Sequence, residues 1–162
     1  MKLSMRTTPW DSLLAFSLTA VLVVLCGCLP AAAALGGDIS SVEADQAHMK
    51  GTLHSTAAGA YTLHEIQAPS GTLREYASPA GKIFAVGWQG MRTPNLQQVL
   101  GPYFAQYQEA AAQERKEHPG RHPVVIETPG LVVEMGGHMR AFEGRAYVPE
   151  MLPQGVRAED IR

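Results

Sequence analysis

Cysteine is nearly absent from this chain of 162 residues, which has only Cys26 and Cys28. Both lie in an N-terminal segment that we expect to be removed, so the remaining domain has neither a disulfide nor a thiolate. This absence excludes cysteine nucleophiles and cysteine-ligated zinc from that domain. The domain must therefore rest on its hydrophobic core, which a single domain of this length is large enough to bury.

An excess of basic residues is also lacking, since 13 Lys and Arg stand against 15 Asp and Glu, for a net charge of −2. Binding to nucleic acid needs clustered positive charge, so we expect no nucleic-acid partner. The sequence has neither a phosphate-loop motif nor a nucleophile-elbow motif. His64-Glu65 begins like a zinc-protease helix, but Ala68 stands where the second histidine is needed. We therefore predict no catalytic residue, no cofactor and no metal site.

The first 34 residues have the layout of a secretory signal peptide. Lys2 and Arg6 precede an apolar run over 13–29, and Ala32 and Ala34 occupy the positions of an A-x-A cleavage site. We expect cleavage after Ala34, which places the domain in the periplasm or outside the cell. A transmembrane anchor is the alternative, because the run is nearly long enough to span a bilayer, but no basic stop-transfer cluster follows it.

A lipid anchor is a second alternative for the same segment. Leu25-Cys26-Gly27-Cys28 resembles a bacterial lipobox, in which Cys28 is acylated and becomes the N-terminus. Acylation would tether the domain to a membrane, whereas simple cleavage would release it. We expect contact with a membrane only through the signal sequence or through such an anchor.

Turn signals divide residues 35–148 into the helices and strands of a single domain. Ser40 and Glu43 form a capping-box pattern, which predicts a short helix ended by Gly51. Strand-like segments follow, joined by turns that contain proline and glycine, at 60–68, 72–78 and 82–89. The last of these segments is apolar on both faces, which predicts a central strand.

The longest helix is predicted to start at Thr93-Pro94, where proline occupies the first helical position. Its apolar residues recur with helical spacing and form one stripe, namely Leu96, Val99, Leu100, Tyr103, Phe104 and Tyr107. Gln98 points away from this stripe. Pro102 is expected to kink the helix near Gly101, and Pro119-Gly120 is expected to stop it.

Three more strands are expected at 123–128, 131–135 and 139–148, and Gly136-Gly137-His138 forms the second turn between them. The tail 149–162 is expected to pack through Met151 and Leu152 and then to fray. The order of elements predicts an α+β domain, in which an antiparallel β-sheet packs on one long amphipathic helix and a short N-terminal helix precedes them. It also suggests a degenerate α-β-β-β repeat.

Four segments of the chain resemble a family of small exported proteobacterial proteins, catalogued as domain of unknown function 2844. They are LGGDISSVEADQ, YTLHEIQAPSGTLREYASPAGKIFAVGWQG, LGPYFAQYQ and TPGLVVEMGGHMRAFEGRAYVPEMLPQGV. The resemblance covers nearly the whole domain. It implies an exported envelope protein, and it brings no activity, ligand or catalytic residue with it.

The turn at Gly136 and Gly137 is the candidate interaction site, because glycines let a partner's backbone approach closely. His138 and Arg140 would be presented beside it. The simpler alternative is a hairpin turn with no further role. Charged residues along the strands are expected on a solvated sheet face, and these are Arg74, Glu75, Arg140, Glu143 and Arg145.

Two histidines at the end of the long helix, His118 and His122, have a spacing that a loop could fold around a metal ion. Glu114 or Glu117 would have to complete the site, because two imidazoles are too few. We expect a solvated loop here, and we expect Trp88 to lie in the core.

The function expected from these observations is a non-enzymatic module that binds an envelope protein or a small ligand through its exposed sheet face and hairpin turns. An alternative is a small hydrolase or metal-dependent enzyme that uses His138, Arg140 and a carboxylate such as Glu134 or Glu143. A lipid-anchored protein with a structural role is the third expectation. An enzyme requires these groups to converge in a pocket, whereas a binding module requires an accessible face.

Overall fold

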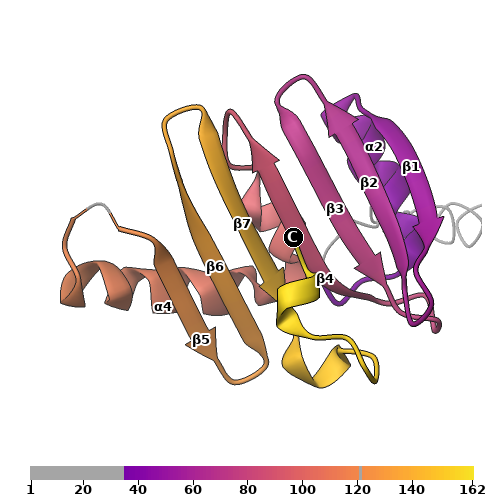
Figure 1. Cartoon of the computed structure of the whole chain (residues 1–162). Coiled ribbons are helices and arrows are strands. Elements are labelled where there is room, and N and C mark those ends of the chain that lie inside the picture. Colours follow the sequence, from indigo (N-terminus) through magenta and orange to yellow (C-terminus); the bar gives the residue numbers. More distant parts are fainter. Residues whose placement is uncertain (1–34, 121) are drawn as a thin grey trace, which may run out of the picture. The chain divides into compact units, whose positions relative to one another are not determined.

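The structure is a computed structural model, and it describes residues 35–120 and 122–162. The predicted signal peptide and Cys28 lie outside the described residues. The described part is a single antiparallel sheet with helices on one face and the C-terminal segment on the other (Figure 1). It is therefore an α+β domain, as the sequence predicts. No helix in these two ranges is long and apolar enough to cross a membrane.

Seven strands of the described chain form the sheet in the order β1-β2-β3-β4-β7-β6-β5. Their bounds are Thr52–Ala57 (β1), Thr62–Ala68 (β2), Gly71–Ala77 (β3), Ile83–Gly90 (β4), Val124–Thr128 (β5), Leu131–His138 (β6) and Ala141–Tyr147 (β7). Strand β4 lies at the centre, and its side chains from Ile83 to Trp88 are buried. The prediction of a central strand here is confirmed.

Strand β1, which pairs along its whole length with β2, was not predicted from the sequence. Most of its side chains are exposed, so it lacks the alternation of apolar and polar residues that marks a half-buried strand. The element order is therefore a helix and four strands, followed by helices and three strands. The suggested α-β-β-β repeat does not describe the first half.

The short N-terminal helix α2 spans Val42–Met49 and follows the 3-10 turn Ile39–Ser41 (η1). The predicted capping box of Ser40 and Glu43 does not form, because Ser40 lies inside η1 and the N-cap of α2 is Ser41, whose hydroxyl donates to the carbonyl of Asp38. The helix ends at Lys50, which adopts a left-handed conformation with φ 52°. Only two side chains of α2, Val42 and Asp45, are buried.

The predicted long helix is broken into α3 (Leu96–Leu100), a 3-10 turn (Gly101–Tyr103, η2) and α4 (Phe104–Glu117). Gly101 has φ 49°, so the break falls at the predicted position. The cap differs from the prediction, because the side chain of Asn95 accepts a hydrogen bond from the Gln97 amide at 3.1 Å. The apolar stripe packs on the sheet and buries Val99, Leu100 and Tyr107.

The hairpin between β6 and β7 turns two residues later than predicted. Gly136 and Gly137 lie within β6, opposite Glu143 and Phe142, and the turn is Met139-Arg140. Gly137 has φ 96°, and a Cβ there would lie 2.0 Å from the carbonyl oxygen of Ala141. The glycine is needed for close strand pairing, and Arg140 takes the left-handed turn position with φ 67°.

The C-terminal segment covers part of the face that has no helices. It contains the 3-10 turns Pro149–Met151 (η3) and Ala158–Asp160 (η4) and ends on a small second core. The predicted packing of Met151 and Leu152 is confirmed, but the expected fraying is not found, since Ile161 is only 1% exposed. Ile161 contacts a cluster formed by Tyr76, Phe84 and Ala85.

Candidate functional site

Two pairs of opposite charges lie in one row across the helix-free face. The guanidinium of Arg145 donates from Nη2 to both carboxylate oxygens of Glu134, at 2.9 and 2.8 Å. On the other side of β4, Nε of Arg74 donates to Glu65 at 2.8 Å. Each pair joins directly opposite residues of a hairpin, β6–β7 or β2–β3. Cross-strand pairing fixes both guanidinium groups with their remaining donors free for other acceptors.

Those donors bind main-chain carbonyls of the C-terminal segment. Nη1 of Arg145 donates to the carbonyls of Ala158 and Ile161, at 2.6 and 3.2 Å. Nη1 of Arg74 donates to the carbonyl of Arg162 at 3.4 Å. Between the two arginines lies Gly87, where a Cβ would be 2.5 Å from that same carbonyl oxygen. The glycine therefore lets polypeptide lie directly on the sheet.

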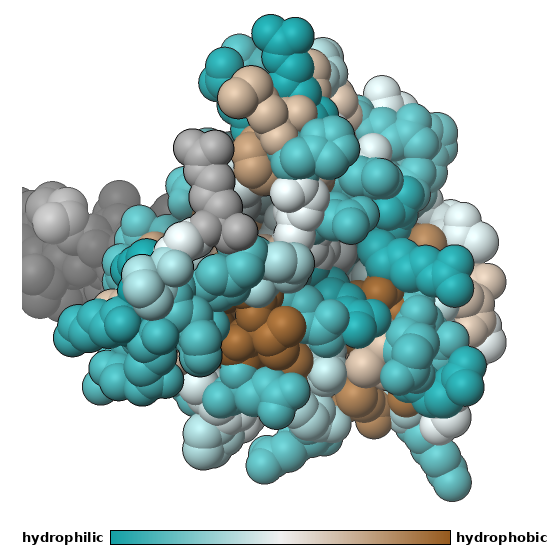
Figure 2. Space-filling view, turned by 60° about the vertical axis from the view of Figure 1, so that its left-hand side comes forward, coloured by the Kyte–Doolittle hydropathy of each residue, from teal (hydrophilic) through white to brown (hydrophobic). Residues whose placement is uncertain are grey.

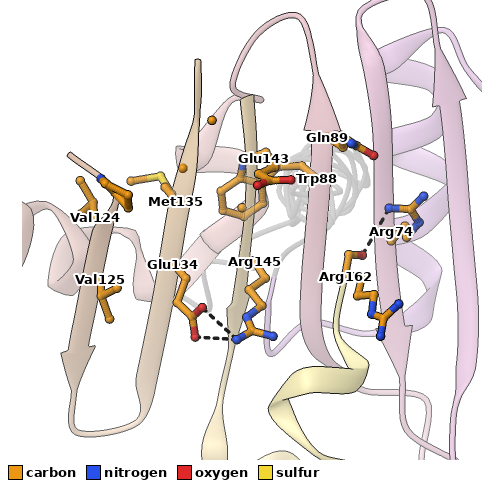
Figure 3. A pocket seen from close by; sticks show the side chains of 14 residues that line it. Arg74, Trp88, Gln89, Val124, Val125, Glu134, Met135, Glu143, Arg145 and Arg162 are labelled. Carbon is orange, nitrogen blue, oxygen red and sulfur yellow. Dashed lines mark hydrogen bonds and ion pairs between the residues drawn. The ribbon is translucent and has the colours of Figure 1, made fainter. Parts of the chain in front are cut away.

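Beside the C-terminal segment, the same face is hollowed into a cavity of about 530 Å³, which we call the open-face groove. Figure 3 shows Glu134, Arg145, Arg74 and Arg162 around it, with Val125 at the far side. Gly136 also lines the groove, and a Cβ built there would meet no atom within 4 Å. The groove is therefore an open space with fixed charged groups, of a size typical of ligand sites.

The surface seen from the side of α4 and β5 is mostly hydrophilic, with apolar atoms only in small separate patches (Figure 2). Large apolar side chains that are exposed in the described chain are few, namely Ile39, Met91, Val125 and Met139. Of these, Val125 lines the open-face groove. Recognition of a ligand or partner by the surface in this view must therefore rest on polar contacts more than on apolar burial.

The structure separates the predicted interaction residues into two groups. Gly136 and Gly137 line the open-face groove, whereas His138 and Arg140 lie at the exposed tip of the β6–β7 hairpin and do not line it. Nδ1 of His138 is 3.3 Å from the carbonyl oxygen of Met139. Arg140 borders a shallow depression with Ser70 and Met91. The glycines and the charged residues of this motif thus face different surroundings.

The carboxylates named for an enzyme lie in the open-face groove without His138 or Arg140. Glu134 is held by Arg145, and Glu143 lines the same groove. The hydrolase alternative requires an imidazole and a guanidinium that converge with these carboxylates in one cavity. The described residues do not place them in this way.

Glu75 was predicted to lie on the solvated face of the sheet, and this prediction is wrong. Glu75 is 1% exposed and lies under α2, beside Asp45, which is also 1% exposed. Burial, together with the hydrogen bond to and the charge of Asp45, raises the pKa of Glu75 to about 9. Burial also raises the pKa of Asp45. Glu75 is therefore protonated at neutral pH, and its proton lies between the two carboxyl groups.

The sequence contained a signal for this burial. Consecutive strand residues point to opposite faces, so Arg74 and Glu75 cannot both be solvated, and Glu75 shares its face with the buried Leu73. No signal identified its partners, because Gln98, which was predicted to point away from the core, donates an amide hydrogen bond to Asp45. That contact joins α2 to α3 across a long stretch of sequence.

His64 extends this buried polar group toward the sheet edge. It lies opposite Glu75 on β3 and opposite Ser55 on β1, and its Nδ1 is 2.8 Å from the Ser55 hydroxyl. The imidazole is 6% exposed, and burial lowers the pKa of His64. Trp88 is in the core as predicted, with 3% exposure, but its indole Nε1 has no hydrogen-bond partner among the described residues.

The two histidines considered for a metal site have different surroundings. Nδ1 of His118 is 3.0 Å from the carboxylate of Glu114, and Glu117 is close to both. The ring nitrogens of His122 instead lie 2.9 and 2.8 Å from the carbonyl oxygens of Pro123 and His118. The carbonyl of Pro123, followed by that of His118, raises the pKa of His122. His122 is therefore oriented to donate to the main chain.

A family model described as "Protein of unknown function (DUF2844)" matches residues 31–161. The chain belongs to this family. No curated protein matches the chain, and no solved structure matches it. The family match confirms the resemblance found in the sequence, and the site must be interpreted from its own geometry.

Proposed function

We propose that this DUF2844 protein is an exported, non-enzymatic binding module that holds a polypeptide segment of a partner protein in the open-face groove. The observation that carries the proposal is the way Arg74 and Arg145 bind the carbonyls of the C-terminal segment. A partner segment laid in the groove would meet the donors of the same fixed guanidinium groups that these contacts leave, Nη2 of Arg74 and Nε of Arg145, beside the same strands. Main-chain recognition of this kind tolerates many side chains and suits a protein-binding role.

Export is proposed from the signal-peptide pattern of residues 1–34. Whether the N-terminus is Leu35 or an acylated Cys28 follows from the intact mass of the protein isolated from the cells that produce it. A mass that begins at Leu35 supports a free module. A diacylglycerol adduct on Cys28 would show instead that the module is tethered to a membrane.

The groove is tested by filling it. Gly136→Trp projects an indole into space that is empty in the structure, and Gly136 needs no left-handed conformation, so the fold should tolerate the change. Gln108→Trp is the matched control, because this exposed residue lies on α4, on the other face of the sheet. A photo-crosslinking amino acid is placed at Val125, and the protein is illuminated in extract of the producing cells. Adducts with a partner protein should form, and they should be lost in Gly136→Trp and kept in Gln108→Trp.

The same partners recovered with Gly136→Trp would show that the groove is not the binding surface. Circular dichroism of both variants must first match that of the unaltered protein. A specific partner recovered only through the β6–β7 tip, for example through crosslinks from Met139, would move the site to His138 and Arg140.

A further inference from the structure

A second cavity lies on the other face of the sheet, between α2, the β2–β3 turn and the start of α3. Its volume is about 270 Å³, and we call it the α2 cavity. It is lined by side chains of mixed chemistry, including Asp45, His48, Trp88, Arg92 and Gln98. This volume is slightly below the usual range of ligand pockets, so an occupant must be small.

The inner part of the α2 cavity holds a buried acid without an ionic partner, and its Oδ2 accepts no hydrogen bond from the described residues. Asp45 is 1% exposed and lines the cavity. Among the described residues its hydrogen-bond contacts are to the neutral Gln98 and to Glu75, and the exposed His48 acts on it only through its charge. None of the ion pairs found among the described residues includes Asp45 or Glu75. Buried charges in proteins are normally paired with an opposite charge. The missing partner here is a cation.

The mouth of the α2 cavity has the opposite character. Arg92 and His48 line it and are exposed. Arg92 makes no ion pair with any described residue. A guanidinium at the entrance disfavours a simple cation and favours a ligand whose outer end is a carboxylate.

We propose that the α2 cavity binds a small amino-carboxylate, such as a free amino acid or a short ω-amino acid, with its ammonium group at Asp45 and its carboxylate at Arg92. The ammonium supplies the positive charge that the buried carboxyl pair lacks. Trp88, whose indole nitrogen has no partner, lies along the wall of the same cavity. Trp88 also lines the open-face groove, whereas Asp45 and Arg92 line the α2 cavity and not the groove, so variants of these two residues separate the two proposals.

Trp88 reports on binding. The chain has two tryptophans, and Trp10→Phe leaves Trp88 as the only indole. The full chain with this change is titrated with glycine, β-alanine and 4-aminobutyrate, and with methylamine and acetate as half-ligands. At least one amino-carboxylate should give a saturable change in Trp88 emission, with an affinity at least about tenfold higher than either half-ligand, because two charge-assisted contacts are made instead of one.

Two variants assign the two ends of the ligand. Asp45→Asn should lower the affinity for the amino-carboxylate about tenfold or more, and Arg92→Ala should do the same while leaving methylamine binding unchanged. Glu109→Gln, an exposed change on α4, is the control and should have no effect. Arg92 is exposed, so its variant keeps the test valid if Asp45→Asn fails to fold.

The pH dependence provides a readout that nonspecific binding would not give. The ammonium contacts the carboxylate of Asp45, whose pKa is raised by burial, so the affinity should fall when the pH is lowered and Asp45 becomes protonated. His48 also faces Asp45, so the titration is repeated with His48→Gln, which should keep this fall. The proposal is overturned if calorimetry and fluorescence both show no binding of the three amino-carboxylates. It is also overturned if Asp45→Asn folds and binds as the unaltered protein does, or if the affinity is independent of pH.

Discussion

The two halves of the sheet differ most clearly in one row of residues that crosses every strand on the helix side. Under α2 the row consists of Ser55, His64 and Glu75, and under α4 it consists of Ala146, Val133 and Ile126, with Val86 of β4 between them. From His64 to Ile126 these residues are buried, whereas Ser55 on the edge strand β1 is exposed. The same sheet thus buries a polar row on one side of its central strand and an apolar row on the other.

This difference shows how the two helices are held. Helix α4 and its neighbour α3 bury aliphatic and aromatic side chains, whereas α2 buries little besides Val42 and a carboxyl group. An apolar contact is insensitive to pH, but a shared proton between two carboxyl groups is not. The α2 half should therefore respond to charge and pH, and the α4 half should respond only to volume and polarity.

The largest effect is expected from placing a carboxyl group in the apolar row. Val133→Glu puts a charge where no donor is available, and it should lower the free energy of unfolding by at least about 3 kcal/mol or prevent folding. Chemical denaturation measures this change. Val125→Glu, on the neighbouring strand at a side chain 53% exposed, should stay within about 0.5 kcal/mol. Similar stability of both variants would mean that the two halves do not differ in their tolerance of charge.

A smaller effect is expected at the contact between α2 and α3. Gln98→Asp removes the amide that donates to Asp45 and adds a third acid to the buried pair, and it should cost about 2 kcal/mol at pH 7. Gln97→Asp, one residue earlier and exposed near the start of α3, is the control and should cost less than about 0.5 kcal/mol. Equal melting temperatures for the two variants would contradict the contact.

The polar half should also make the stability depend on pH. The pKa of Glu75 is raised from 4.5 to about 9, so between these values the folded protein binds a proton that the unfolded chain releases. The free energy of unfolding should therefore fall as the pH rises, by at most about 1.4 kcal/mol from pH 7 to pH 8. Glu75→Gln keeps a donor to Asp45 and should flatten this slope. A slope unchanged in Glu75→Gln would assign the pH dependence to other groups.

The smallest effects are expected on the helix-free face, where the halves resemble each other. Arg145→Ala loses a bidentate ion pair and two carbonyl contacts, and it should cost about 1 kcal/mol. Arg74→Ala loses one ion pair and one long carbonyl contact, so its cost should be lower still. Thermal melts compare the two variants, and the reverse order would contradict the role of Arg145 in holding the C-terminal segment.

The features that could be predicted from the sequence are those whose signals lie within a few consecutive residues. The central position of β4 follows from a run that is apolar on both faces, and the break at Gly101 follows from the adjacent proline. Strand β1 was missed because pairing with β2, and not burial of its own side chains, holds it in the sheet. The open-face groove and the α2 cavity could not be predicted, since each brings together residues from distant parts of the chain.

The position of β4 between β3 and β7 affects the order in which the protein can fold as it is synthesised. Strands β1 to β4 follow one another in sequence and can pair as soon as they leave the ribosome, but β7 is made only after α4, β5 and β6. Until then β4 presents an unpaired edge with apolar side chains on both faces, which is the kind of segment that aggregates or is bound by chaperones. The nascent chain is therefore most vulnerable after Gly90 has emerged and before Ala141 arrives.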